Sequence, residues 1–137
     1  MNDKIFIDSN IFLYAFSTKD LNKQHIAASI IMQDATISTQ VINEVSNNLL
    51  KKLGLGNDEV QSFVEDCYAR YTVADFSRTI FVEAALLRER HGFSYYDSLI
   101  VSSALSSSRT ILYSEDMQHG QRIYDRLTIV NPFVEPM

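Results

Sequence analysis

The sequence predicts an α/β fold, specifically a three-layer α/β/α sandwich around a mostly parallel sheet of about five strands. Two observations support this class. Five short stretches rich in β-branched and aromatic residues recur along the chain, and longer stretches with helical periodicity separate them. Such alternation indicates β/α units, whose strands lie parallel because each helix returns the chain to the same edge of the sheet.

The elements follow in order along the chain. The expected strands are Lys4–Asp8, Ala35–Thr39, Tyr71–Phe76, Arg109–Ser114 and Leu127–Phe133. The expected helices are Asp20–Gln33, Thr39–Gly54, Asp58–Tyr71, Ser77–Gly92 and Ser94–Ser107, and a short helix is expected over "NIFLYAF". The last four of the long helices begin at or just after a Ser, Thr or Asn that can cap a helix, and two of them end at glycine.

Composition bounds the classes of function. With 137 residues, 46% of them apolar and 21% charged, residues 1–137 are expected to form a single domain. No apolar run approaches the roughly 18 residues that span a bilayer, and the first residues are polar, so we expect a cytoplasmic protein. The net charge of −5 argues against a broad basic surface for nucleic acid. It does not exclude a local site, because bound divalent cations reverse the sign of an acidic pocket.

Four acidic residues stand at the ends or starts of elements that meet at one edge of the expected sheet. Asp8 and Asp116 follow strands, where ligands collect in open parallel sheets. Each could equally cap the segment after it. Glu44 lies one turn into the helix after the second strand, where a solvated glutamate is also favoured. Asp97 completes "SYYD", which is a capping box.

Taken together, these four carboxylates predict a cation site. Like charges a few ångströms apart raise one another's pKa and are unstable without neutralisation. Hard oxygen ligands in such an arrangement suit Mg²⁺ or Mn²⁺. The charge at Asp8, between a buried strand and a helix, is then explained as a metal ligand.

Four segments, "FIDSNIFLYAF", "STQVINEV", "FSYYDSLIVSSAL" and "LYSEDMQHGQRI…LTIVNPF", stand in a specific order. Together they resemble the PIN-domain ribonucleases, in particular the VapC-type toxins of prokaryotic toxin–antitoxin pairs. The resemblance runs nearly end to end and implies a PIN-like fold. Asp8, Glu44, Asp97 and Asp116 match the four acidic residues of the family's catalytic site, and none is missing.

The resemblance implies an endoribonuclease that works without a covalent intermediate. One or two Mg²⁺ or Mn²⁺ ions, held by the four acids, would activate a water for in-line attack on phosphorus and stabilise the departing 3′-oxygen. The products would carry 5′-phosphate and 3′-hydroxyl ends. Ser9, Asn10 and Ser114 would hydrogen-bond the ligand oxygens, although Ser9 and Asn10 could be simple turn residues.

The same resemblance implies partners. These are an RNA substrate, a cognate antitoxin whose basic tail would enter the acidic site, and a second copy of the chain in a homodimer. Tyr95 or Tyr96 could stack a splayed base, with the other in the core. Phe12, Tyr14 and Phe16 form a helix face that packs inward or onto a second copy.

Other classes of protein fit parts of the pattern. A haloacid-dehalogenase-like phosphatase places an Asp after strand one but needs a second Asp two residues later, where this chain has Asn10. A receiver domain needs paired acids after strand one and a late strand-end Lys, and Asp75 alone does not supply them. A non-catalytic binding module with a structural metal cluster, and a stand-alone RNA-processing nuclease of the PIN type, remain as alternatives.

Overall fold

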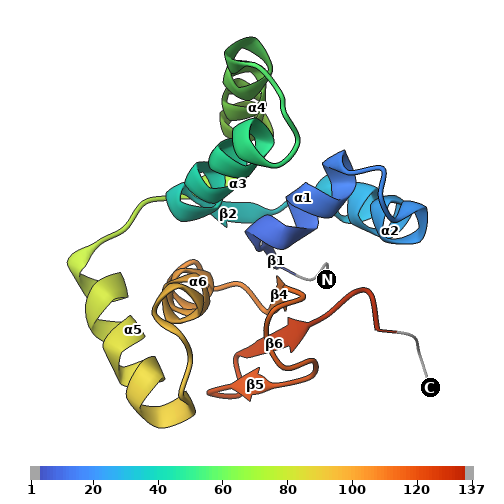
Figure 1. Cartoon of the computed structure of the whole chain (residues 1–137). Coiled ribbons are helices and arrows are strands. Elements are labelled where there is room, and N and C mark those ends of the chain that lie inside the picture. Colours follow the sequence, from blue (N-terminus) through green and yellow to red (C-terminus); the bar gives the residue numbers. More distant parts are fainter. Residues whose placement is uncertain (1–3, 135–137) are drawn as a thin grey trace.

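The computed structural model describes residues 4–134, so the two ends of the predicted domain, residues 1–3 and 135–137, lie outside the description. Six helices and six strands follow one another in these residues (Figure 1). Their order is β1 (Ile5–Ile7), α1 (Ser9–Phe16), α2 (Leu21–Ile31), β2 (Thr36–Ser38), α3 (Thr39–Lys51), α4 (Asn57–Arg70), β3 (Thr72–Ala74), α5 (Arg78–His91), α6 (Tyr95–Ser106), β4 (Ile111–Tyr113), β5 (Arg122–Ile123) and β6 (Leu127–Val130).

The sheet has the order β3-β2-β1-β4-β6-β5, and every neighbouring pair is parallel except β5 and β6. The predicted class is therefore confirmed: a mostly parallel sheet flanked by helices (Figure 1). The strand β1 lies between β2 and β4, so successive strands are added in opposite directions from it. This reversal makes the carboxyl end of β1 a topological switch point, where ligands bind in open α/β sheets.

The sixth strand, β5, was not predicted, because the turn that forms it gives no sequence signal. Arg126 N–H donates to the carbonyl of Ile123 at 3.0 Å across a tight turn. The two central residues, Tyr124 and Asp125, have φ values of 54° and 53°. Hairpin turns with two positive φ values normally carry Asn-Gly or Asp-Gly. Tyr-Asp lacks the glycine, so the hairpin stays invisible in the sequence.

All five long helices that the sequence predicts are present, with bounds within three residues of the expected ones. The side chains of Ser38, Ser77 and Ser94 accept backbone N–H groups at the starts of α3, α5 and α6. These bonds satisfy donors that have no partner inside a helix. Gly92 ends α5 with φ 71°, a conformation that favours glycine.

The aromatic face of α1 packs inward. Phe12 is 1% exposed, and its ring centroid lies 5.8 Å from that of Phe63 and 5.6 Å from that of Tyr71. Tyr14 packs against Phe133 at 4.9 Å. Phe16 is exposed, yet its ring contacts that of Phe63 edge to face. This face therefore anchors α1, the helix that follows Asp8, to α4 and to the segment that follows β6.

Within residues 4–134, no helix combines the length and the apolar composition needed to cross a membrane.

Replacing Phe12 by alanine is expected to lower the free energy of unfolding by about 3–5 kcal/mol, because it removes a buried ring and leaves a cavity. Phe81→Ala on α5, where the ring is 45% exposed, is the matched control and should cost less than about 1 kcal/mol. Urea denaturation with an unchanged m-value measures both. Equal losses in the two variants would contradict the anchoring role of Phe12.

Candidate metal centre

Asp8 lies at the switch point, directly after β1. It is 3% exposed and caps α1, with one carboxylate oxygen accepting the N–H of Ser9 at 2.7 Å. The other oxygen accepts the hydroxyl of Ser114 at 2.9 Å. Its backbone N–H donates to Tyr113 at 3.0 Å, which continues the pairing of β1 with β4. Asp8 is thus a helix cap, as one interpretation of its sequence position predicts, and it also lines a cavity.

Asp116 lies two residues beyond Ser114, at the end of the neighbouring strand β4. Its carboxylate oxygen Oδ2 accepts the Nδ2 amide of Asn10 at 3.0 Å, and its backbone N–H donates to the hydroxyl of Ser114 at 3.3 Å. In the described part of the chain no helix begins after Asp116, so the alternative of a helix cap is wrong. Ser114 and Asn10 therefore tie Asp116 to Asp8 and to α1.

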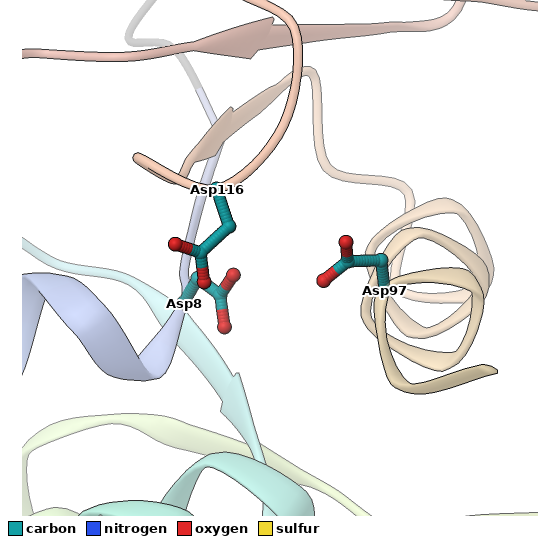
Figure 2. Close-up of side chains that lie close together, drawn as sticks. All are labelled: Asp8, Asp97 and Asp116. Atoms are coloured by element: carbon teal, nitrogen blue, oxygen red, sulfur yellow. The ribbon is translucent and has the colours of Figure 1, made fainter. Parts of the chain in front are cut away.

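Asp97 reaches the same place from the start of α6. The hydroxyl of Ser94 accepts its N–H at 3.2 Å, which is one half of the predicted capping box. Between residues 4 and 134 no hydrogen bond runs from the Ser94 N–H back to the Asp97 carboxylate, so the capping box is only half formed. Figure 2 shows this carboxylate pointing from α6 towards Asp8 and Asp116. One oxygen from each of the three aspartates lies within 4.8 Å of the others.

Glu44 lines the same cavity, of about 320 Å³, but stands outside this group of three. Its oxygen Oε2 accepts the hydroxyl of Ser9 at 2.7 Å, and Oε1 accepts the side-chain amide of Gln40 at 2.8 Å. It is half-buried, so the interpretation as a freely solvated glutamate is wrong. The structure thus brings Asp8, Asp97 and Asp116 together and places Glu44 on the wall beside them.

Gln40 is the residue that the sequence analysis missed. Its buried side chain donates to Glu44 and to the backbone carbonyl of Tyr96 at 3.3 Å, which links α3 to the start of α6. The spacing of four residues between Gln40 and Glu44 was the one signal that the sequence offered. The expectation that Tyr95 or Tyr96 lies in the core is wrong, since the two are 51% and 63% exposed.

The cavity carries negative charge that the protein does not neutralise. Burial raises the pKa of Asp8 to about 7, and repulsion by Glu44 and Asp116 adds to the effect against the bonds from Ser114 and Ser9. Burial also raises the pKa of Asp97, against the opposing effect of the Ser94 hydroxyl and together with repulsion by Asp116 and Glu44. Among residues 4–134, no lysine, arginine or histidine forms an ion pair with any of these four acids.

This donor set fits a divalent cation. Several carboxylate oxygens converge on one point, they are hard ligands, and their mutual repulsion is relieved by a positive ion. Fold and cavity together define a class: an α/β protein with an acidic site at the switch point of a parallel sheet.

The family follows from comparison with known proteins. The model of the PIN domain family matches residues 5–124, and the chain belongs to that family. No curated protein matches the chain.

Solved structures share the fold. A toxin–antitoxin complex from Klebsiella pneumoniae superposes with a TM-score of 0.72 at 16% identity, covering 95% of this chain and 98% of its own. VapC20 from Mycobacterium tuberculosis, a toxin that cleaves the sarcin-ricin loop, has a TM-score of 0.67 at 15% identity. The match covers 82% of this chain and 90% of VapC20. DNA-bound VapBC from Salmonella typhimurium has a TM-score of 0.65 at 19% identity. The match covers 93% of this chain and 97% of the matched chain. At these identities the likeness shows a common fold.

The raised pKa of Asp8 predicts a pH dependence of stability in EDTA. Between about pH 4 and pH 7 the folded protein keeps a proton on Asp8 that the unfolded chain releases. The free energy of unfolding therefore falls as pH rises through this range and levels off above it. A change from 3.8 to about 7 corresponds to a loss on the order of 4 kcal/mol.

Denaturation at pH 5 and pH 8 measures about two thirds of this loss. Asp8→Asn isolates the contribution of Asp8 because it removes the ionisable group. The variant is expected to lose less stability than the parent between the two pH values. If the free energy of unfolding had the same pH dependence in the parent and in Asp8→Asn, ionisation of Asp8 would not destabilise the folded protein, which would contradict the raised pKa.

Proposed function

We propose that this chain is an endoribonuclease that depends on Mg²⁺ or Mn²⁺ and hydrolyses RNA phosphodiester bonds. The observation that carries the proposal is the convergence of Asp8, Asp97 and Asp116 at the switch point, with no cationic side chain paired to them among residues 4–134. An acidic cavity repels RNA unless a cation occupies it. Membership of the PIN domain family supports the same activity.

In this proposal Asp8, Asp97 and Asp116 hold the cation, and Glu44 completes the site from the wall of the cavity. When bound, the ion supplies Lewis acidity for the attacking water and for the charge that develops on the phosphate and leaving oxygen. The protein supplies positioning. Ser114 and the Ser9 N–H fix the two oxygens of Asp8, while Asn10 fixes Asp116.

The hydroxyl of Ser9 gives it a second function. It donates to Glu44 at 2.7 Å while its backbone N–H donates to Asp8 at 2.7 Å, so one residue orients two acids. Ser9, Asn10 and Ser114 thus make the contacts expected of residues that orient metal ligands. The simple turn interpretation of Ser9 and Asn10 does not account for these bonds.

We further propose that the chain is the toxin of a toxin–antitoxin pair in the cytoplasm. Several structures that share its fold are toxin–antitoxin complexes, and their chains match this one over nearly their full length. The unneutralised acids would attract an Arg or Lys side chain in the absence of a cation. A basic segment of an antitoxin therefore fits the same cavity.

Asp97→Asn is expected to abolish RNA cleavage, with a loss of more than about 100-fold, because it removes one of the three carboxylates that converge in the cavity. Asp75→Asn is the matched control, since Asp75 also follows a strand of the sheet but is exposed and lies outside the acidic group. Labelled total RNA is incubated with each protein in Mg²⁺, in Mn²⁺ and in EDTA.

Cleavage by the parent and by Asp75→Asn, lost in EDTA and in Asp97→Asn, would establish the nuclease, and sequencing the 5′-phosphate ends would identify the RNA. No cleavage by the parent in either metal, with Asp97→Asn less stable than the parent, would instead make the acids a structural cluster of a binding module.

An RNA substrate also gives a role to the exposed tyrosine beside the cavity. Tyr96 lines the cavity that the four acids share, and its ring meets that of Tyr95 edge to face at 5.3 Å. The guanidinium of Arg88 lies 5.0 Å from the Tyr95 ring and donates to Ser98, which holds the pair in place. A fixed exposed ring next to the acids suits stacking on an unpaired base.

Tyr96→Ala is expected to raise KM about tenfold with kcat little changed, because stacking contributes about 1–3 kcal/mol per base. Tyr96→Phe keeps the ring and should behave as the parent. Tyr68→Ala, at a similarly exposed tyrosine of α4, is the control for the loss of any surface ring. Steady-state cleavage of a short labelled RNA measures all four proteins. An unchanged KM in Tyr96→Ala would remove Tyr96 from the substrate contacts.

A further inference from the structure

We propose that three side chains outside the acidic cavity, Tyr14, Lys23 and Glu115, position Asp116 for cation binding. We call them the Glu115 cluster. The inference rests on the proposed function in one respect, that a divalent cation binds beside Asp116. It assigns a role at the acidic site to residues outside the four acids that the sequence analysis matched.

The cluster is closed by short hydrogen bonds to both oxygens of Glu115. Lys23 Nζ donates to Oε2 at 2.6 Å, and the Tyr14 hydroxyl donates to Oε1 at 2.6 Å. Lys23 Nζ also donates to the Tyr14 hydroxyl at 3.3 Å. The ammonium lies 4.6 Å from the centroid of the Tyr14 ring and 5.3 Å from that of Phe133. Lys23–Glu115 is the one ion pair found in residues 4–134.

These contacts fix a segment that has no regular structure of its own. Glu115 and Asp116 follow β4 in a bend, and Asp116 is exposed, so the sheet alone does not hold its carboxylate in place. Glu115 comes from this segment, Tyr14 from α1 and Lys23 from α2. The cluster therefore attaches the bend to two helices at the residue next to Asp116.

Two residues of helix α1, Asn10 and Tyr14, bind the segment of Glu115 and Asp116. Asn10 Nδ2 donates to Asp116, and Asn10 Oδ1 accepts the backbone N–H of Glu115 at 3.1 Å. Tyr14 stands four residues later, one turn along the same face, and holds the Glu115 side chain. With side chain and backbone of Glu115 both fixed, the chain cannot rotate at this position without breaking a bond. The carboxylate of Asp116 is thereby kept facing Asp8 and Asp97 (Figure 2).

A purely stabilising role and a direct electrostatic role of the cluster predict different results from a positioning role. If the cluster serves stability alone, its loss lowers the melting temperature and leaves the affinity for a cation unchanged. If its charges act on the cation through space, removing the positive charge of Lys23 strengthens cation binding, because like charges repel. If it positions Asp116, removing that same positive charge weakens binding. The sign of the effect of Lys23→Met separates positioning from direct electrostatics.

The experiment measures Mn²⁺ binding to the full chain, by the electron paramagnetic resonance signal of free Mn²⁺, well below the melting temperature of every variant. Lys23→Met is expected to bind Mn²⁺ about tenfold more weakly than the parent, the lower end of the loss seen for residues that orient metal ligands. Tyr14→Phe, which changes no charge, is expected to weaken binding as well.

Lys19→Met is the matched control. Lys19 is exposed and lines the neighbouring cavity with Asn10 and Glu115, and no hydrogen bond from its ammonium is found among the described residues. Its loss removes one positive charge from the same side of the molecule, so Mn²⁺ affinity should stay unchanged or rise slightly.

A parent that binds Mn²⁺, with Lys23→Met binding it equally or more tightly, would overturn the role of the Glu115 cluster and leave the proposed function standing. A parent that binds no Mn²⁺ would overturn the cation site, and with it both proposals. The two failures are therefore distinguishable in one titration series.

Discussion

The buried charge of Asp8 is the constraint on which the rest of the site depends. Its position at the carboxyl end of the central strand β1 is dictated by the strand order, and its burial follows from the helices that cover the sheet. The Asp8 carboxylate accepts hydrogen bonds from Ser9 and Ser114, which are neutral donors. Neutral donors lower the cost of the charge without cancelling it, so the negative potential remains available to a ligand.

Function at this site is in tension with stability. A lysine or arginine in the cavity would neutralise Asp8, but it would also fill the place that the proposed cation would take. The ion pair found among residues 4–134, Lys23–Glu115, instead lies outside the cavity, and Glu115 is the residue next to Asp116. The stability of α1 is instead supplied by Phe12 and its aromatic neighbours, which carry no charge. Packing thus holds the helix whose first residues must stay polar.

The elements of this fold were predictable where local chemistry determines them. The bounds of the long helices could be predicted to within three residues. The signals were serines that cap helices, a glycine that ends α5 and apolar residues at helical spacing. The strand β5 was not predictable, since its turn places Tyr124 and Asp125 in a conformation that their side chains do not signal. The four acids could be grouped from the sequence because Asp8 and Asp116 follow strands, Asp97 lies in the first turn of α6, and Glu44 lies about one turn into α3. For Gln40 the sequence offers only its spacing of four residues from Glu44 on the same helix, because its other partner, Tyr96, belongs to a helix that meets α3 only in the folded chain.

The identity of residue 10 shows how one atom separates two classes of protein. A phosphatase of the haloacid-dehalogenase type would need aspartate there. Asn10 uses both ends of its amide: Nδ2 donates to Asp116 at 3.0 Å, and Oδ1 accepts the N–H of Glu115 at 3.1 Å. An aspartate could still accept from Glu115, but its second oxygen would face the Asp116 carboxylate and repel it. The amide that excludes the phosphatase in the sequence is therefore the same group that holds the acidic site together in the structure.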